Sequence, residues 1–478
     1  MRTHGSAVRF AGPLGALLAL IVSLPAVSAA NDADKALSQK LESIRRHFGL
    51  NRAIGVIVRD AESGETLYAH NADRKYIPAS GMKLAIIGAS LHYLGPNYRF
   101  ETEFLVDGAF DDGVVRGDLY VRGSGDPSLT HHEMDYIARS LAKAGLRGVE
   151  GDLVMDDSFF DDRLRGPASY DNILKHGLPI QSALSYNFNR VELKATPSAP
   201  GDRASLHDGG YGYFDVTNRV TTASRGAPWV RVQKVRGDRV VVRGRVIKGD
   251  EEERVGSFIA PNPTQYFASA LLGKMEENGI SVSGTIRNDA VGERSLDVLY
   301  VHTSARLVEV LSALGKYSNN FSAEQMLKAL GAHRWGAPGS FESGARAVGE
   351  YLVGLGFRKN DFRIVDGSGL SYDNHLSASI LSRVLQELYR SPELKTDFIC
   401  SLALGGVDGT LRRRFLNEKH MGRVMAKTGS LASVSSLSGI AISSSRGPLI
   451  FSVITNGIGK QYRADHVEDQ IARALVDY

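Results

Sequence analysis

A lysine, a threonine and a glycine follow one another at Lys427-Thr428-Gly429, at the end of an apolar run that predicts a β-strand. A glycine within a strand often marks a place where a ligand or another backbone comes close. A strand edge with these residues can bind an extended peptide by strand addition, and its ammonium and hydroxyl groups can hold a carboxylate. The tripeptide predicts a peptide-binding strand, although an ordinary surface strand end would also fit it.

A serine and a lysine three residues apart, Ser80 and Lys83, precede a long apolar segment. Pro78 disfavours a helix before it, and the apolar segment predicts a buried helix after it. Ser80 then lies at the helix N-terminus, where the positive end of the dipole favours developing negative charge. Residues three apart share a helix face, so a neutral Lys83 could take the proton of the Ser80 hydroxyl and generate a nucleophile.

A second serine and an amide, Ser318 and Asn320, follow an apolar helical segment between these two motifs. The order Ser-x-x-Lys, Ser-x-Asn, Lys-Thr-Gly is the signature of penicillin-binding proteins and serine β-lactamases. Lys-Thr-Gly occurs once in the sequence. The motifs therefore predict a nucleophilic serine with two lysines and a second serine around it.

Two other segments match parts of the signature. Ser140 is followed three residues later by a lysine, and Ser185 is followed two residues later by an asparagine. Ser140 lies in the middle of a predicted helix, where its hydroxyl has no dipole end to use. Ser185 follows no apolar helix. We therefore assign the motifs to Ser80 and Ser318.

Further segments extend the likeness from about residue 53 to the C-terminus. They are Gly-Ser-Gly-Asp-Pro at 123–127, Asp-Asp-Ser-Phe-Phe-Asp at 156–161, Asn-Phe-Asn at 187–189, Asp-Gly-Ser-Gly-Leu-Ser at 366–371 and Asp-Gly-Thr-Leu at 408–411. With the three motifs, they make the chain resemble the low-molecular-mass class C penicillin-binding proteins, the D-alanyl-D-alanine carboxypeptidase/endopeptidase family.

The resemblance implies a mechanism and its catalytic residues. Ser80 attacks the carbonyl of a terminal D-Ala-D-Ala bond or of a D-Ala cross-link in peptidoglycan, and Lys83 acts as the base. Ser318 relays the proton to the leaving amine. Asn320 holds Lys83 and the substrate amide, and Lys427 supports Ser318. We expect the two lysines to raise the cost of protonating each other, which favours a neutral Lys83.

The resemblance also implies the substrate contacts. Thr428 and Ser430 bind the terminal carboxylate, Gly429 belongs to the same strand, and the backbone N–H groups of Ser80 and Ser430 form the oxyanion hole. Asp171 is a further candidate, for the diamino acid of the stem peptide. Ser368, within Gly-Ser-Gly, is expected in a turn near the cleft. The expected ligands are peptidoglycan stem peptides, with β-lactams as inhibitors and with no cofactor or metal.

Two other functions share some of these features. A serine β-lactamase has the three motifs, but the chain has a large insertion and lacks an obvious acidic loop that would activate a deacylating water. A catalytically inactive peptidoglycan-binding scaffold would not need all three motifs intact.

The first residues have the pattern of a secretory signal peptide, expected over residues 1–29. Arg2 and Arg9 precede a short apolar core, and small residues at 27–30 suit cleavage. We therefore expect an exported protein, periplasmic in a Gram-negative source and otherwise extracellular or in the cell wall. No integral membrane anchor is expected after cleavage.

Charge and cysteine content narrow the class of protein. The formal net charge is +4, and loss of two arginines with the signal peptide leaves +2, which gives no basis for a nucleic-acid partner. The run Arg412-Arg413-Arg414 is expected on a solvated face. Cys400 is the only cysteine, so the exported chain has no internal disulfide and must depend on its core.

The strand and helix patterns predict an α+β fold. Strand-like segments at 54–59 and 66–69, joined by a turn, and three more at 423–428, 437–443 and 449–455 predict one antiparallel sheet flanked by helices, like a transpeptidase or β-lactamase domain. A final helix is expected to pack on it. The domain is expected in two parts, residues 30–98 and 290–478.

A long interval separates the first two motifs. From Ser80 to Ser318 the chain runs more than twice as far as from Ser318 to Lys427, and this interval is rich in β-strand patterns. Gly237-Asp238 has the form of a two-residue hairpin turn. We predict an inserted, mainly β region over residues 99–289, itself one or two modules. Its role could be that of a scaffold or of a docking site for a partner, and a scaffold is favoured.

Overall fold

The computed structural model describes residues 24–166, 180–236, 239–249, 253–459 and 461–478. Most of the expected signal peptide, residues 1–23, therefore lies outside the described part, and Leu24 begins helix α1 (Leu24–His47). Among the residues described, no helix is long and apolar enough to cross a membrane.

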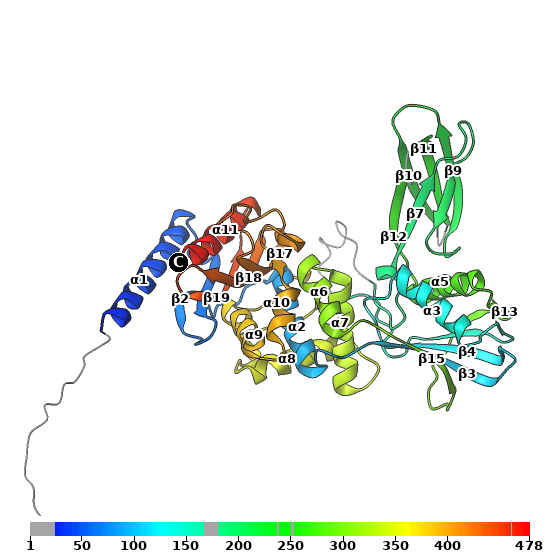
Figure 1. Cartoon of the computed structure of the whole chain (residues 1–478), viewed down its shortest axis with the longest axis horizontal. Helices are drawn as coiled ribbons and strands as arrows, with labels where there is room; N and C mark the ends of the chain where they lie inside the picture. The colour runs from blue at the N-terminus through cyan, green and yellow to red at the C-terminus, as the bar shows by residue number, and fades with distance from the viewer. Residues whose placement is uncertain (1–23, 167–179, 237–238, 250–252, 460) are drawn as a thin grey trace, which may run out of the picture.

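One antiparallel sheet is built from both ends of the chain, as predicted (Figure 1). Its strand order is β16-β17-β18-β19-β1-β2. The N-terminal hairpin joins the C-terminal strands because β1 pairs with β19 along its whole length, with Ile54 opposite Thr455. The strands are β1 (Ile54–Asp60), β2 (Thr66–His70), β16 (Ala403–Leu404), β17 (Val424–Leu431), β18 (Val434–Ser443) and β19 (Gly447–Asn456).

Helices cover both faces of this sheet. Successive side chains of a strand point to opposite faces, and on β19 Phe451 contributes to a core with α1 and α11, whereas Ile450 contributes to a core with the remaining helices. The predicted α+β class, with an antiparallel sheet flanked by helices, is confirmed. The helices are α11 (Gln461–Asp477) beside α1, and α2 (Met82–Tyr93), α6 (Leu307–Tyr317), α7 (Asn320–Trp335), α8 (Phe341–Gly354), α9 (Ala378–Arg390) and α10 (Lys395–Ser401).

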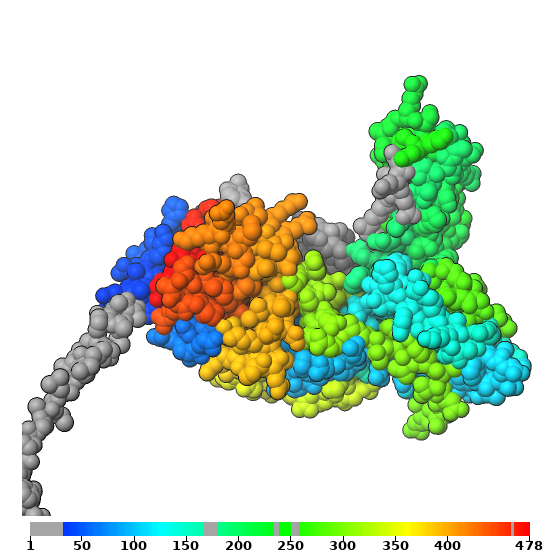
Figure 2. All heavy atoms as spheres, viewed as in Figure 1, coloured from blue at the N-terminus to red at the C-terminus, as the bar shows by residue number. Residues whose placement is uncertain are grey.

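The segment between α2 and α6 forms a separate mass at the other end of the molecule (Figures 1 and 2). Its mixed sheet has the order β13-β5-β4-β3-β15, with β6 beside β4 and β14 beside β6. Helices α3 (His131–Lys143) and α5 (Pro263–Glu277) pack on it. The strands are β3 (Glu101–Asp111), β4 (Val114–Gly123), β5 (Gly148–Val149), β6 (Leu153–Asp156), β13 (Ser281–Val282), β14 (Ile286–Asn288) and β15 (Asp297–Thr303).

The remaining strands of the insertion project from this mass (Figure 1). They form the sheets β10-β11-β9 and β12-β7-β8. One buried cluster runs from the mixed sheet, through α3 and α5, into β7, β9 and β11. The strands are β7 (Arg190–Thr196), β8 (Ser205–Asp208), β9 (Asp215–Ala223), β10 (Trp229–Arg236), β11 (Arg239–Ile247) and β12 (Glu253–Ile259).

Two predictions about the insertion, its C-terminal end and one hairpin turn, can be compared with the structure. The mixed sheet ends with β15, which pairs with β3 and lies beyond residue 289, the predicted end of the inserted region. The expected hairpin turn Gly237-Asp238 lies outside the described residues, although β10 and β11 on either side of it pair antiparallel.

Candidate active site

The turn before α2 carries the candidate nucleophile. A single 3₁₀ turn, η1 (Ala79–Gly81), leads into α2, and Lys83 lies in the first turn of that helix. Ala79 has a positive φ of 48°, a conformation that a residue with a Cβ rarely adopts. Ser80 therefore sits on a sharp turn just before the helix rather than inside it. Its side chain stays partly exposed, whereas α2 is buried from Met82 to Leu91.

Lys83 connects the candidate nucleophile to two other segments. Its Nζ lies 2.8 Å from Ser80 Oγ, 2.9 Å from Asn320 Oδ1 and 2.6 Å from the Ser368 carbonyl oxygen. The Lys83 side chain is 0 % exposed. Burial lowers the pKa of Lys83 to about 7, because the charged ammonium loses its hydration there. A substantial fraction of Lys83 is therefore neutral near neutral pH.

A second serine–lysine pair lies close by. Ser318 ends α6 in the left-handed conformation, with φ of 59°. Lys427, on β17, donates to Ser318 Oγ at 2.8 Å and to the Thr428 carbonyl at 2.7 Å, and it is also 0 % exposed. Asn320 is the first residue of α7, and the neighbouring Asn319 is the residue that caps this helix. The amide of Asn320 is thus left to contact Lys83.

The prediction that mutual repulsion of Lys83 and Lys427 favours a neutral Lys83 needs a correction. Burial, and not repulsion between the ammonium groups, is the largest cause that lowers the pKa of each. Repulsion from Lys83 comes second for Lys427. For Lys83 the next contributions come from Asp366 and Glu324, which raise its pKa.

Two buried carboxyl groups that were not predicted as site residues hold the loop beside Lys83. Glu324, one turn along α7 from Asn320, accepts hydrogen bonds from the backbone N–H groups of Gly367 (2.9 Å) and Ser368 (3.0 Å). Asp366 accepts from Gly369 N, Ser371 N and Asn374 Nδ2, each at 2.7 Å. Burial raises the pKa of both groups. They fix the loop so that the Ser368 carbonyl faces Lys83.

The sequence indicates that Asp366 belongs to the site more clearly than it does for Glu324. Asp366 begins one of the segments on which the family resemblance rests, so the resemblance marked its position without its role. Glu324 has no comparable signal, because a single acidic residue in a helix is usually on the solvated face. Ser368 lies in a turn at the site, as expected, and its hydroxyl accepts from Leu370 N within that turn.

Strand β17 passes close to the turn that carries Ser80. A Cβ added to Gly429 would lie 2.9 Å from both Gly81 N and Pro78 O. The absence of a side chain at Gly429 thus lets the two backbones approach, as the sequence predicted for a close contact. Ser430, the next residue, is exposed beside this contact.

The outer edge of β17 is open next to the lysine. On this side β16 pairs only with Met425 and Ala426. Within the described ranges no strand pairs with that edge from 427 onward. The Thr428 hydroxyl donates to Thr410 Oγ1 at 2.8 Å. An extended peptide can therefore add to this edge, between Ser80 and Thr428.

The structure brings Ser80, Lys83, Ser318, Asn320 and Lys427 together, with Thr428, Gly429 and Ser430 on the adjoining strand. Asp171 lies outside the described residues. Ser140 is part of α3 in the insertion, and the Ser185 hydroxyl donates to the Ser182 carbonyl inside it. In the described part of the chain, no cluster of three or more His, Cys, Asp or Glu residues could hold a metal ion.

Comparison with known proteins gives the relatives of this chain. The model of the D-Ala-D-Ala carboxypeptidase 3 (S13) family matches residues 37–477. A D-alanyl-D-alanine carboxypeptidase of Actinomadura sp. (strain R39) is 31 % identical, over 96 % of this chain and 88 % of the relative. The D-alanyl-D-alanine carboxypeptidase DacB of Haemophilus influenzae is 28 % identical, over 96 % of this chain and 94 % of the relative.

Solved structures share the fold. The crystal structure of penicillin-binding protein 4 (dacB) from Haemophilus influenzae has a TM-score of 0.73 and 24 % identity, and covers 93 % of this chain and 99 % of that one. The same protein has been solved in complex with a β-lactam, with a TM-score of 0.70 over 92 % of this chain and all of that one. The match over almost the whole sequence confirms the resemblance, and the chain belongs to the D-Ala-D-Ala carboxypeptidase 3 (S13) family of peptidases.

Proposed function

We propose that this protein is an exported serine peptidase that hydrolyses terminal D-Ala-D-Ala bonds and D-Ala cross-links of peptidoglycan through a Ser80 acyl-enzyme. The observation that carries the proposal is the 2.8 Å distance between Ser80 Oγ and the Nζ of the buried Lys83, beside an open strand edge. Family membership and the D-alanyl-D-alanine carboxypeptidases among the relatives support the substrate class.

In the proposed acylation, a bond forms between Ser80 Oγ and the carbonyl carbon, and the peptide C–N bond breaks. Lys83 accepts the hydroxyl proton, and Ser318, in contact with Lys427, passes a proton to the leaving amine. Asn320 keeps Lys83 oriented. Water then hydrolyses the ester, which releases the shortened peptide and restores the Ser80 hydroxyl.

Binding and charge stabilisation are assigned to β17. Thr428 and Ser430 would bind the carboxylate of the leaving residue. The backbone N–H groups of Ser80 and Ser430 would stabilise the oxyanion, and one such donor is typically worth about 3–4 kcal/mol of barrier. The close approach of Gly429 to Gly81 supports this pairing, because it brings the two backbones side by side.

The test is covalent labelling with fluorescent benzylpenicillin, followed by mass spectrometry of the labelled peptide. We expect the label on Ser80 and its complete loss in Ser80→Ala, because a strained cyclic amide presents the same kind of carbonyl to the nucleophile. Ser140→Ala is the matched control and should label like the wild type. Label on Ser140 or Ser368 would refute the assignment.

Digestion of purified muropeptides separates the alternatives. We expect release of D-Ala from pentapeptide monomers and conversion of cross-linked dimers into monomers, read by chromatography. Rapid hydrolysis of the antibiotic with untouched muropeptides would favour a serine β-lactamase. If the protein is not labelled and does not turn over muropeptides, a peptidoglycan-binding scaffold without catalysis is favoured.

A further inference from the structure

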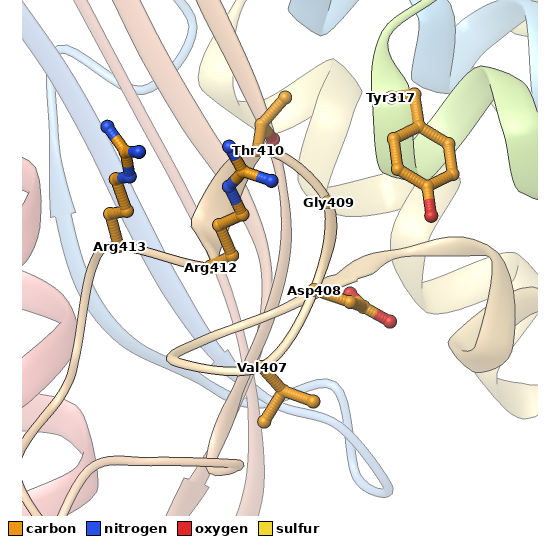
Figure 3. A pocket seen from close by; sticks show the side chains of 7 residues that line it. All are labelled: Tyr317, Val407, Asp408, Gly409, Thr410, Arg412 and Arg413. Atoms are coloured by element: carbon orange, nitrogen blue, oxygen red, sulfur yellow. The ribbon is translucent and has the colours of Figure 1, made fainter. Parts of the chain in front are cut away.

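A surface pocket of about 500 Å³ lies beside the end of the candidate active site (Figure 3). The pocket adjoins the site at two points. Tyr317 directly precedes Ser318, and Thr410 accepts a hydrogen bond from Thr428 at 2.8 Å. The residues that line it are Tyr317, Val407, Asp408, Gly409, Thr410, Arg412 and Arg413.

The pocket carries an unbalanced positive charge. Arg412 and Arg413 are exposed, and neither has an ion pair or side-chain hydrogen bond with any residue in the described ranges. The acidic residue of the pocket, Asp408, is already engaged, since it forms an ion pair with Lys316 and accepts from Leu404 N at 2.7 Å. It therefore does not neutralise the two guanidinium groups.

The third arginine of the run behaves differently. Arg414 turns inward and contacts Glu468 at 3.1 Å and Asp469 at 2.6 Å on α11. The expectation that the whole run lies on a solvated face is thus wrong for Arg414, because α11 supplies partly or fully buried carboxylates for it. Of the three arginines, only Arg412 and Arg413 line the pocket. The pocket is also lined by the exposed side chains of Tyr317 (68 % exposed) and Val407 (55 % exposed).

The position of the pocket along a bound substrate follows from the proposed function. The acyl part of the substrate is attached to Ser80, and the carboxylate of the leaving residue lies at Thr428. A leaving D-Ala ends at that carboxylate and does not extend further. In a cross-link the leaving residue is a diamino acid, and its chain continues into a second stem peptide. Thr410 connects Thr428 to the place where this continuation would lie.

We propose that the pocket of Arg412 and Arg413 is a leaving-group subsite that binds the acidic second stem peptide of a cross-link. This inference rests on the proposed function and deepens its endopeptidase part. The two arginines attract the carboxylates of the departing peptide, and Tyr317 and Val407 cover its apolar portions. A free D-Ala leaving group gains nothing from the subsite, so the subsite raises the preference for cross-linked substrate.

The test compares kcat/KM for a cross-linked dimer with kcat/KM for a pentapeptide monomer. In R412Q/R413Q we expect the dimer-to-monomer ratio to fall by about tenfold, the size expected for two exposed charge contacts. R219Q/R225Q is the matched control. It removes two exposed arginines from the projecting part of the insertion and should keep the wild-type ratio.

A second substrate tests whether charge attraction between the two arginines and the departing peptide causes the preference for the cross-linked dimer. When the carboxylates of the leaving stem peptide are amidated, except the carboxylate of the leaving residue that binds at Thr428, the wild-type ratio should fall by a similar factor, and the double variant should lose little more. A ratio that is unchanged in the double variant, or an amidation effect of equal size in both proteins, would overturn the subsite.

The outcomes also separate this inference from the proposed function. If the wild type releases D-Ala and is acylated by penicillin but never cleaves the dimer, the subsite is refuted and the carboxypeptidase proposal stands. If the wild type does neither, the proposed function fails and the subsite fails with it. Melting temperatures of the variants serve as the check on folding.

Discussion

Lys83 has three hydrogen-bond partners and no exposure to solvent. An ammonium has three N–H groups and could donate to all three oxygens, and a neutral amine has two N–H groups and one lone pair, which also match the three partners. In the neutral amine, the two N–H groups donate to Asn320 Oδ1 and the Ser368 carbonyl, and the lone pair is free to accept from the Ser80 hydroxyl. Because these contacts fit both forms, it is burial, which lowers the pKa of Lys83, that favours the neutral form that a general base needs.

The pH dependence of acylation tests this state of Lys83. A protonated Lys83 cannot take the Ser80 proton, so the acylation rate should rise with pH through the pKa of Lys83, about 7, and then level off. The measurement is the second-order rate constant for benzylpenicillin between about pH 5 and about pH 9. A flat profile, or one that falls with rising pH over this range, would contradict the assignment of Lys83 as the base.

The neighbouring carboxyl group of Glu324 provides a second test of the pH profile. The negative charge of Glu324 raises the pKa of Lys83, so Glu324→Gln should shift the midpoint to lower pH. Glu393→Gln, which changes an exposed glutamate of the same type, should leave the midpoint where it is. Because the readout is a midpoint and not a rate, a general loss of activity from a disturbed 366–371 loop would not imitate it.

At the residue scale, the sequence predicted the members of the site that belong to short motifs. Ser80 and Lys83 are near neighbours along one turn, and the Ser-x-Asn and Lys-Thr-Gly motifs are read directly from the chain. Glu324 could not be predicted, since its burial depends on the 366–371 loop folding over α7. The roles of all these residues stay predictions until the variants are measured.

At the scale of elements, β17 and the Ser80 turn form one unit. Residues 429–431 of β17 pair with β18, so the strand continues through the Lys-Thr-Gly motif, as its sequence predicted. The sequence could not predict the partner and register of this part of the strand, because the pairing depends on β18. Close contact between Gly429 and the turn fixes the distance between the two halves of the site.

The contact predicts the effect of Gly429→Ala. The added Cβ would lie 2.3 Å from Ser436 Oγ and 2.9 Å from Gly81 N and Pro78 O, and the two backbone atoms cannot rotate away. β17 must then move from the Ser80 turn. A misplacement of about 1 Å can cost about 100-fold in rate, so we expect penicillin acylation to slow by about that factor. Overpacking of this kind typically costs about 1–3 kcal/mol of stability.

The matched control is Gly354→Ala at the exposed end of α8, where an added Cβ meets nothing within 4 Å. Alanine is favoured over glycine in a helix, so this change should keep the acylation rate and slightly raise the melting temperature. A Gly429→Ala protein that acylates at the wild-type rate would show that the strand and the turn are not in functional contact.

At the scale of the whole molecule, α7 joins the two cores. Its first residue, Asn320, contacts Lys83, whereas Gln325 and Lys328 reach into the insertion. Gln325 Nε2 donates to the Ser182 carbonyl at 2.9 Å. The sequence indicated an insertion from the spacing of the motifs. It could not predict this junction, because the polar residues of α7 that form it look like an ordinary solvated face.

Lys328 is a buried charged residue at this junction. Its side chain is 0 % exposed, pairs with the Asp161 carboxylate at 2.7 Å, and donates to the carbonyls of Asp161 (3.1 Å) and Arg163 (3.0 Å). The ammonium also lies 5.1 Å from the ring centres of Phe160 and Phe341. It thereby holds the segment that follows β6 in the insertion against the peptidase helices.

We therefore expect Lys328→Met to loosen this segment without stopping the chemistry. Methionine fills most of the volume but leaves the Asp161 and Arg163 carbonyls without their donor, which should cost about 1–3 kcal/mol of stability. Hydrogen exchange, read by mass spectrometry on peptides that cover 157–166, should become faster, while penicillin still acylates Ser80. Lys359→Met, at an exposed lysine, should change neither measurement. If exchange in 157–166 stays as slow as in the wild type, the insertion is held by the apolar contacts of Phe160 and Phe341 alone, and the buried ammonium is not what joins the two parts of the molecule.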